Sequence, residues 1–174
     1  MDTASLPARW LTDHRALLPA GGDALDVACG RGRHALWLAA EGFSTLALDR
    51  DLDAVAAVRR AAAARGLPVT ALVRDLEGGT PGLPAGRFAV VVAVHYLHRP
   101  LMPALVAAVA PGGVLVYETF TRAQSARGRP TNPDFLLKPG ELPLLARPLE
   151  VLRSREGDYE GRWVASVIAR RPAG

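Results

Sequence analysis

The sequence predicts an α/β fold: a seven-stranded, mostly parallel sheet with one antiparallel strand and helices on both faces. Short apolar runs alternate with segments of helical periodicity along most of the chain, the pattern of strands joined by crossover helices. The last two apolar runs, residues 149–155 and 162–169, follow each other without a helix. They are therefore expected to form a hairpin, which supplies the antiparallel strand.

Length and composition indicate one globular unit. The 174 residues are enough for a single domain with a substantial core, and 49% hydrophobic with 22% charged residues does not indicate disorder. No apolar run reaches the roughly 18 to 20 residues of a membrane span, and the N-terminus lacks the pattern of a signal peptide. We therefore expect residues 1–174 to form one cytoplasmic domain without a membrane partner; the oligomeric state stays open.

The net charge and the cysteine content limit the kinds of partner and metal site that the chain is expected to have. The net charge of +4 comes from scattered arginines, with Lys138 as the sole lysine, so an acidic partner is permitted and a nucleic-acid partner is not expected. Cys29 is the single cysteine, which excludes an internal disulfide and a cysteine cluster for a metal. We expect it to be a small residue in a tight turn.

The segment at residues 24–40, ALDVACGRGRHALWLAA, predicts a strand, a glycine turn and a helix. The apolar run 24–28 is interrupted by Gly30 and Gly32, helix-forming residues resume at 33–40, and Gly42 ends them. Glycine lets the backbone approach a ligand closely, and a new helix begins with unpaired N–H groups. A nucleoside-bearing cofactor fits such a turn.

Two cofactor classes use this kind of turn. The pattern Gly30-x-Gly32-x-x-Ala35 formally satisfies the dinucleotide fingerprint, and Asp49 lies near the spacing of an acid that binds a ribose diol. Asp26 inside the strand favours the other class, because a buried carboxylate needs donors such as an ammonium group and would repel a pyrophosphate.

The run Asp26-Val27-Ala28-Cys29-Gly30-Arg31-Gly32 resembles the first motif of the class I S-adenosylmethionine-dependent methyltransferases. Its extension to residue 35 is similar to small bacterial methyltransferases of the tellurite-resistance type. The resemblance implies a Rossmann-like fold, S-adenosyl-L-methionine as cofactor, and turn glycines that line its methionine part. We expect the cofactor to contact Asp26, Ala28, Gly30, Gly32, Arg33, Asp49, Arg50, Asp75, Leu76 and His95.

The first element in the chain is an amphipathic helix expected over residues 5–18, which Pro19 ends. Two roles stay open for residues 1–22: cover for one edge of the domain, or, as the resemblance implies, part of a lid. In the second case Trp10 would contact the acceptor.

Two further strands end in acids. The strand 43–49 ends at Asp49, whose two oxygens are spaced for a vicinal diol, and the resemblance implies that it binds the ribose. Asp51 is expected to cap the following helix, which begins at residue 52 and ends at Gly66. The strand 69–74 is closed by Asp75 and Leu76, which the resemblance places at the adenine, and residues 78–86 form a loop.

The strand 88–94 delivers the segment His95-Tyr96-Leu97-His98 at its carboxyl end, where ligands bind in open α/β sheets. The H-x-x-H spacing lacks a third ligand, so no metal is expected. For His95 and Tyr96 two roles stay open, facing the substrate or packing against the methyl-donor end of the cofactor, and His98 is expected at the acceptor.

The next elements are a helix over 100–110, a type II turn at Pro111-Gly112-Gly113, and a strand over 114–119 that carries Glu118. The loop 121–139 is longer than compact domains usually carry without a purpose. We expect it on the substrate side, with Arg127, Arg129 and Lys138 recognising an anion; an exposed basic loop without a ligand stays open. A short helix is expected over 140–147.

These residues predict a methyltransferase that acts on a small molecule, with an anion or a soft nucleophile as the expected acceptor. A sulfonium methyl is already activated, so its transfer needs mainly proximity and alignment. The candidate catalytic residues are His95, Tyr96 and Glu118. Three alternatives stay open: an RNA or protein methyltransferase, which the absence of an N-P-P-Y motif disfavours; a non-catalytic cofactor-binding protein; and an NAD-binding module.

Overall fold

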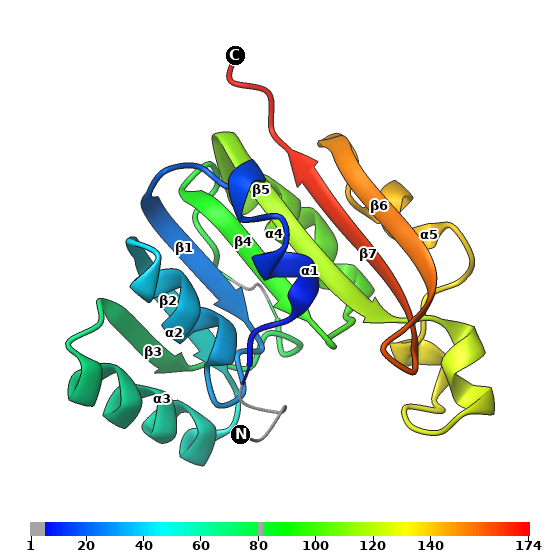
Figure 1. The fold of residues 1–174 in the computed structure, drawn as a ribbon, viewed down its shortest axis with the longest axis horizontal. Helices are drawn as coiled ribbons and strands as arrows, with labels where there is room; N and C mark the ends of the chain where they lie inside the picture. Colours follow the sequence, from blue (N-terminus) through cyan, green and yellow to red (C-terminus); the bar gives the residue numbers. More distant parts are fainter. Residues whose placement is uncertain (1–5, 80–81) are drawn as a thin grey trace.

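The computed structural model describes residues 6–79 and 82–174, and its strands form one seven-stranded sheet (Figure 1). The order across the sheet is β3-β2-β1-β4-β5-β7-β6. Among the described strands, β7 runs in the direction opposite to the other six, so the predicted sheet is confirmed. The strands are β1 (Gly22–Val27), β2 (Phe43–Asp49), β3 (Val69–Val73), β4 (Phe88–Val94), β5 (Val109–Phe120), β6 (Glu150–Tyr159) and β7 (Arg162–Arg170).

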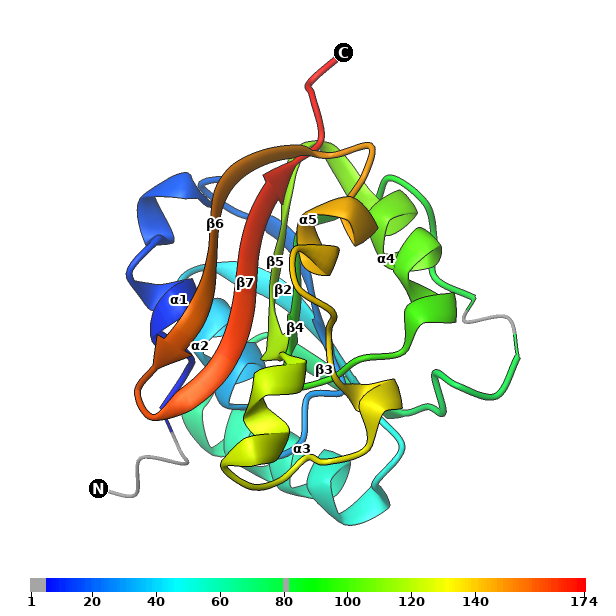
Figure 2. The ribbon, with the colours of Figure 1, turned by 90° about the vertical axis from the view of Figure 1, so that its right-hand side faces the viewer.

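Helices cover both faces of the sheet, as predicted (Figure 2). One face carries α1 (Arg9–Thr12), α2 (Arg33–Ala40) and α3 (Leu52–Arg65), and the other carries α4 (Met102–Ala108) and α5 (Glu141–Leu145). Alternate residues of the central strand β4 serve the two layers: Val90 and Val92 pack with α1 and α2, and Val91 packs with α4. The central strand β4 is therefore covered on both sides.

Elements with strong local signals lie where the sequence predicts them. The bounds of α2, β2 and β4 agree with the expected ranges. Asp51 caps α3, because its carboxylate accepts hydrogen bonds from the backbone N–H groups of Asp53 and Ala54. Gly66 ends that helix in the left-handed conformation at φ +60°.

The N-terminal segment differs from the expectation, since the helix over 5–18 is interrupted. Residue 5 lies outside the described range, α1 has four residues, and a 3-10 turn follows at Arg15–Leu17. The Nδ1–H of His14 donates to the carbonyl of Trp10 at 2.9 Å. In a continuing helix this carbonyl would accept from the backbone N–H of His14, so the side chain competes with the helix.

The segments around β5 also depart from the sequence prediction. The expected helix 100–110 begins with a 3-10 turn, Arg99–Leu101, and α4 ends at residue 108 because Val109 pairs with β4. The turn at 111–113 lies within β5 and shifts its register, with Gly112 at φ +74°. The loop 121–139 contains two 3-10 turns, Arg122–Ala126 and Pro133–Phe135.

The final hairpin is tighter than the sequence predicts. Its strands extend until Tyr159 pairs with Arg162, which leaves Glu160 and Gly161 as the turn, at φ +55° and +76°. Two left-handed residues are typical of a type I′ turn. Among residues 6–79 and 82–174, no helix has the length and apolar character needed to cross a membrane.

Candidate active site

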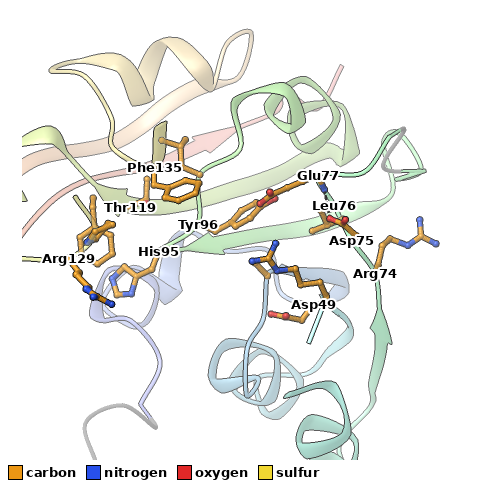
Figure 3. A pocket seen from close by; sticks show the side chains of 15 residues that line it. Asp49, Arg74, Asp75, Leu76, Glu77, His95, Tyr96, Thr119, Arg129 and Phe135 are labelled. Atoms are coloured by element: carbon orange, nitrogen blue, oxygen red, sulfur yellow. Dashed lines mark hydrogen bonds between the residues drawn. The ribbon is translucent and has the colours of Figure 1, made fainter. Parts of the chain in front are cut away.

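A cavity of about 580 Å³ lies at the carboxyl ends of the first five strands. Figure 3 shows His95 and Arg129 at one end, Asp75 at the other, and Tyr96 between them. This edge of the sheet collects ligands because successive parallel strands deliver their following loops to the same side. The lining includes eight residues singled out from the sequence, namely Ala28, Asp49, Arg50, Asp75, Leu76, His95, Tyr96 and Arg129.

The turn after β1 adopts left-handed backbone at three positions. Ala28 has φ +53°, Gly30 has φ +53° and Gly32 has φ +77°. A side chain on Gly30 would meet nothing within 4 Å, whereas a Cβ on Gly32 would lie 2.6 Å from a methyl of Val58. Gly30 therefore leaves open space beside the turn, and Gly32 allows α2 to pack against α3.

Asp26 lies buried beneath this turn and does not line the cavity. Its Oδ2 accepts a hydrogen bond from the backbone N–H of Ala35 at 2.9 Å, while Oδ1 has no hydrogen-bond partner among the described residues. The Nδ1 of His34 is 3.9 Å from Oδ1. Burial raises the pKa of Asp26 to about 7, against the opposing effects of the Ala35 N–H and Arg33.

We expect Asp26→Asn to change how stability depends on pH. Because the pKa is raised from 3.8 to about 7, the folded state holds this proton more tightly than the unfolded chain. The resulting stabilisation is complete below pH 3.8 and is lost as the pH rises to about 7. Each pKa unit of difference corresponds to about 1.36 kcal/mol, so the loss in free energy of unfolding approaches about 4 kcal/mol. Asparagine has no such proton, so the variant should lack this pH dependence. The wild type should therefore lose stability relative to the variant as the pH rises from 3.8 to about 7.

Urea unfolding of both proteins between pH 4 and pH 8 measures this difference. Burial lowers the pKa of His34 to about 3, which gives the opposite pH dependence, and its Nε2 accepts from the backbone N–H of Ala8. His34 is present in both proteins, so its contribution largely cancels in the difference. A difference that stays constant with pH would contradict the prediction.

Asp49 connects the first two strands. Its Oδ2 accepts from the backbone N–H of Gly30 at 2.7 Å, and its Oδ1 accepts from that of Asp51 at 2.9 Å. Each carboxylate oxygen can accept a second hydrogen bond, so both remain available to a diol in the cavity. At the other end, Oδ1 of Asp75 accepts from the backbone N–H of Glu77, and the side chain of Leu76 is buried.

His95 occupies a constrained position after β4. Its backbone is left-handed at φ +58°, its N–H donates to the carbonyl of Glu118 at 2.8 Å, and its ring stacks on Phe120 with centroids 4.6 Å apart. Burial, together with Arg33 and Arg162, lowers the pKa of His95 to about 4. The imidazole is therefore neutral at pH 7. A non-glycine residue held in this conformation is often found at a functional site.

A second cavity, of about 690 Å³, adjoins the first. Both are lined by His95, Phe120 and Arg129, which form what we call the shared wall. The second cavity also contains Glu118, whose Oε2 accepts from Ser166 Oγ at 2.5 Å and from Arg155 at 3.1 Å. Arg33, expected at the cofactor, lines this second cavity instead of the first.

Four residues expected at the acceptor line neither cavity. For Trp10 the structure corrects the expected contact with the acceptor. Its side chain is buried in the core because the short helix α1 turns its apolar face toward the sheet, and its indole N–H donates to the carbonyl of Val167. Arg127 forms an ion pair with Asp158 at 2.7 Å. The remaining two, His98 and Lys138, are also absent from both linings.

Arg99 is a residue that the sequence did not single out. Its guanidinium donates to both carboxylate oxygens of Glu141, at 2.6 and 2.9 Å, and to the carbonyls of Asp134 and Leu136. These bonds fasten the loop 121–139, which carries Phe135 against the first cavity. An arginine in a turn has no local pattern that predicts such contacts.

Arg99→Ala is expected to lower the free energy of unfolding by about 1–3 kcal/mol, because charge-assisted hydrogen bonds are lost and Glu141 is left unpaired. Proteolysis within residues 121–139 should become faster. Arg87→Ala is the matched control, since the ion pair of Arg87 with Asp23 is 54% and 39% exposed and should contribute less than about 1 kcal/mol. Equal proteolysis of the two variants would refute this role of Arg99.

Other lining residues were missed although a signal existed for some of them. Thr119 and Phe120 end β5 at the same edge as the other site residues, so the rule applied to β4 would have found them. Arg162 begins β7 in a hairpin, and no local pattern indicates that it reaches a cavity. Across the described chain, no group of three or more His, Cys, Asp or Glu side chains is arranged to hold a metal ion.

Burial also raises the pKa of the Cys29 thiol, assisted by Asp26 and Asp49. The thiol is therefore protonated at neutral pH, as expected for a small residue in a tight turn.

In the cavity, burial and the carboxylates of Glu77 and Asp75 raise the pKa of Tyr96.

Known proteins resemble this chain in sequence and in fold. Ribosomal RNA small subunit methyltransferase C of Chromohalobacter salexigens is 42% identical over 64 residues, which are 37% of this chain and 19% of that protein. The chain thus matches about a fifth of the length of this relative. TehB from Haemophilus influenzae has a TM-score of 0.77 at 16% identity, over 95% of this chain and 62% of that one.

A methyltransferase from Mesorhizobium loti, described as S-adenosylmethionine dependent, superposes with a TM-score of 0.73 at 21% identity, over 94% of this chain and 98% of that one. At these identities the two solved structures show a shared fold. The model of a family described as a methyltransferase domain matches residues 24–113, just over half of the chain. The match begins in β1 and ends at the glycine turn in β5. The chain therefore belongs to the methyltransferase domain family, and its resemblance to the class I S-adenosylmethionine-dependent methyltransferases is confirmed.

Proposed function

We propose that this protein binds S-adenosyl-L-methionine in the first cavity and transfers its methyl group to a small molecule bound in the second. The single observation that carries the proposal is the shared wall of His95, Phe120 and Arg129 between the two cavities. In an in-line displacement the acceptor atom must lie next to the methyl group of the donor. Two cavities that meet at common residues would bring the two ligands together at that place.

The residues of the first cavity fit the donor. Both oxygens of Asp49 retain acceptor capacity for the ribose hydroxyls. Asp75 and Leu76 would hold the adenine at one end, with Arg50 beside it. The methionine part would lie beside the turn after β1, where Ala28 lines the cavity and Gly30, outside the lining, leaves open space. Asp26 lies beneath the turn and outside the cavity, so its role would be to hold the start of α2 through the hydrogen bond that it accepts from the backbone N–H of Ala35.

The bound cofactor supplies a methyl group on a positively charged sulfur, which is already activated toward nucleophiles. The protein then needs to orient the acceptor and exclude water. A neutral His95 adds no positive charge beside the sulfonium and can accept a proton, although a pKa near 4 makes it a weak base. Tyr96, at the middle of the cavity in Figure 3, would orient the reacting groups.

Glu118 fits a positioning role better than that of a free base. Its carboxylate already accepts from Ser166 and Arg155, and its carbonyl accepts from the N–H of His95. Through these bonds Glu118 would fix His95 at the shared wall. A small acceptor is supported because the volume of the second cavity, about 690 Å³, is within the range of pockets for small organic ligands.

Calorimetry and an acceptor screen test the proposal. We expect S-adenosylmethionine and S-adenosylhomocysteine to bind with dissociation constants of about 1–100 µM, and NAD not to bind. Methyl transfer would then be measured with thiols, phenols, amines, chalcogen oxyanions and ribosomal RNA. Transfer to RNA alone would favour the macromolecular alternative, binding without any transfer would favour a cofactor-binding protein, and binding of NAD alone would overturn the proposal.

A further inference from the structure

The second cavity carries an excess of positive charge. Five arginines and two glutamates line it, which leaves a net charge of three positive units with His95 neutral. Two of the arginines are paired within the protein. Arg155 lies 3.1 Å from Glu118, and Arg9 lies 3.0 Å from Glu160.

The other three arginines of the lining differ from these two. Within residues 6–79 and 82–174, no ion pair involves Arg33, Arg129 or Arg162. Arg33 is half-buried, and its pKa is lowered first by burial and next by the charge of Arg162. Arg162 is exposed, but its charge still repels that of Arg33, and a bound anion between them would offset this repulsion.

Arg155 gives the wall of this cavity a fixed shape. Its guanidinium lies 3.9 Å from the ring centroid of Tyr159 and 4.7 Å from that of Trp10. The planar group is thereby held between two rings and against Glu118. Arg155 is occupied by these partners, so anion binding falls to the unpaired arginines.

We propose that Arg33, Arg129 and Arg162 bind the methyl acceptor through its anionic groups, and that the acceptor is a small organic acid with at least two negative charges. The inference rests on the function proposed above and names its substrate class. Three unpaired guanidinium groups match at least two negative charges. A volume of about 690 Å³ lies within the roughly 300–1,000 Å³ of pockets for organic ligands.

The remaining wall indicates an apolar body for this acid. Leu6, Pro7 and Ala8 from the N-terminal segment line the cavity, as does the ring of Phe120 at the shared wall. The N-terminal segment is held over α2 by hydrogen bonds from Ala8 N–H to His34 and from Arg33 to the carbonyl of Leu6. An acid anchored on the arginines would thus place its apolar body against these N-terminal residues and Phe120.

Binding of four probe acids tests the inference without relying on turnover. Succinate, glutarate, phthalate and phenyl phosphate would be titrated calorimetrically into the full chain saturated with S-adenosylhomocysteine, together with phthalamide as the neutral counterpart of phthalate. We expect at least one acid to bind with a dissociation constant of about 1 mM or tighter, as two charge-assisted pairs provide. Phthalamide should not bind.

Variants then locate the site for the acid that binds most tightly. Arg33→Gln and Arg162→Gln should each weaken its binding by about tenfold or more, and the corresponding lysine variants should restore part of it. Arg87→Gln removes the same charge at the amino end of β4, the end of the strand away from the cavity, and should leave binding of the acid within about twofold. Thermal melts establish that each variant is folded.

The outcomes separate this inference from the proposed function. If S-adenosylhomocysteine does not bind to the wild type, the proposed function itself fails. If it binds and none of the four acids does, or phthalamide binds as well as phthalate, the anionic acceptor is refuted. Loss of S-adenosylhomocysteine affinity in Arg33→Gln, with acid binding retained, would return Arg33 to the cofactor site and overturn its assignment here.

Discussion

Replacing Asp49 with alanine is expected to weaken the binding of S-adenosylmethionine and S-adenosylhomocysteine by about 10- to 100-fold. In the proposed complex both ligands share this acceptor, because it would face the ribose, which methyl transfer leaves unchanged. It also accepts from the backbone N–H groups of Gly30 and Asp51. Its removal would therefore loosen the turn as well as delete the acceptor. Calorimetry with each ligand measures the change.

Asp51→Ala is the matched control for this prediction. Asp51 is an aspartate two residues away, it caps α3, and it does not line the cavity. Its removal should cost about 1 kcal/mol of stability and leave cofactor affinity within about threefold. Asp49→Asn should fall between the wild type and Asp49→Ala, since one acceptor oxygen remains. An affinity of Asp49→Ala within twofold of the wild type would refute the assignment to the ribose.

Gly32→Ala is expected to destabilise the protein by about 2–4 kcal/mol, from a left-handed backbone and an overpacked contact together. The new Cβ would lie 2.6 Å from a methyl of Val58, and the backbone at φ +77° is strained for alanine. Because Val58 is fully buried in α3, it has little room to move. Urea unfolding without ligand measures the loss.

Gly30→Ala separates the two causes. Its φ of +53° gives a comparable backbone strain, but no atom lies within 4 Å of the new Cβ, so the loss should be only about 1–2 kcal/mol. The same methyl would enter space proposed for the cofactor, so affinity should fall more than stability. In the double variant Gly32→Ala with Val58→Ala, part of the packing cost should be relieved. Equal losses for the two single variants would contradict the role of the contact with Val58.

The residues at the carboxyl ends of the strands were predictable from the sequence. Asp49, Asp75 and His95 each follow an apolar run, and the ends of parallel strands share one edge of the sheet. The order β1-β4 at the centre brings His95 beside the glycine turn. Trp10 shows the limit of this reasoning. Helical periodicity predicts which face of a segment is apolar, but it does not predict whether that face packs on the sheet, as Trp10 does, or contacts a ligand.

The second cavity could not be found in this way. Its unpaired arginines come from α2, from the loop after β5 and from the start of β7, and Arg33 and Arg162 are far apart in the chain. Arg127, Arg129 and Lys138 looked equivalent in the basic loop, yet only Arg129 lines a cavity. Arg127 instead pairs with Asp158 of the final hairpin.

The sequence by itself determined the succession of strands and helices, the glycine turn and the acids at the strand ends, because each of these depends on neighbouring residues. Hydrophobic periodicity, helix caps and backbone freedom act over a few positions. Only the tertiary structure decided which arginines face one another and where the N-terminal segment lies. Those relations depend on strand order and on packing between distant segments, so no local pattern contains them.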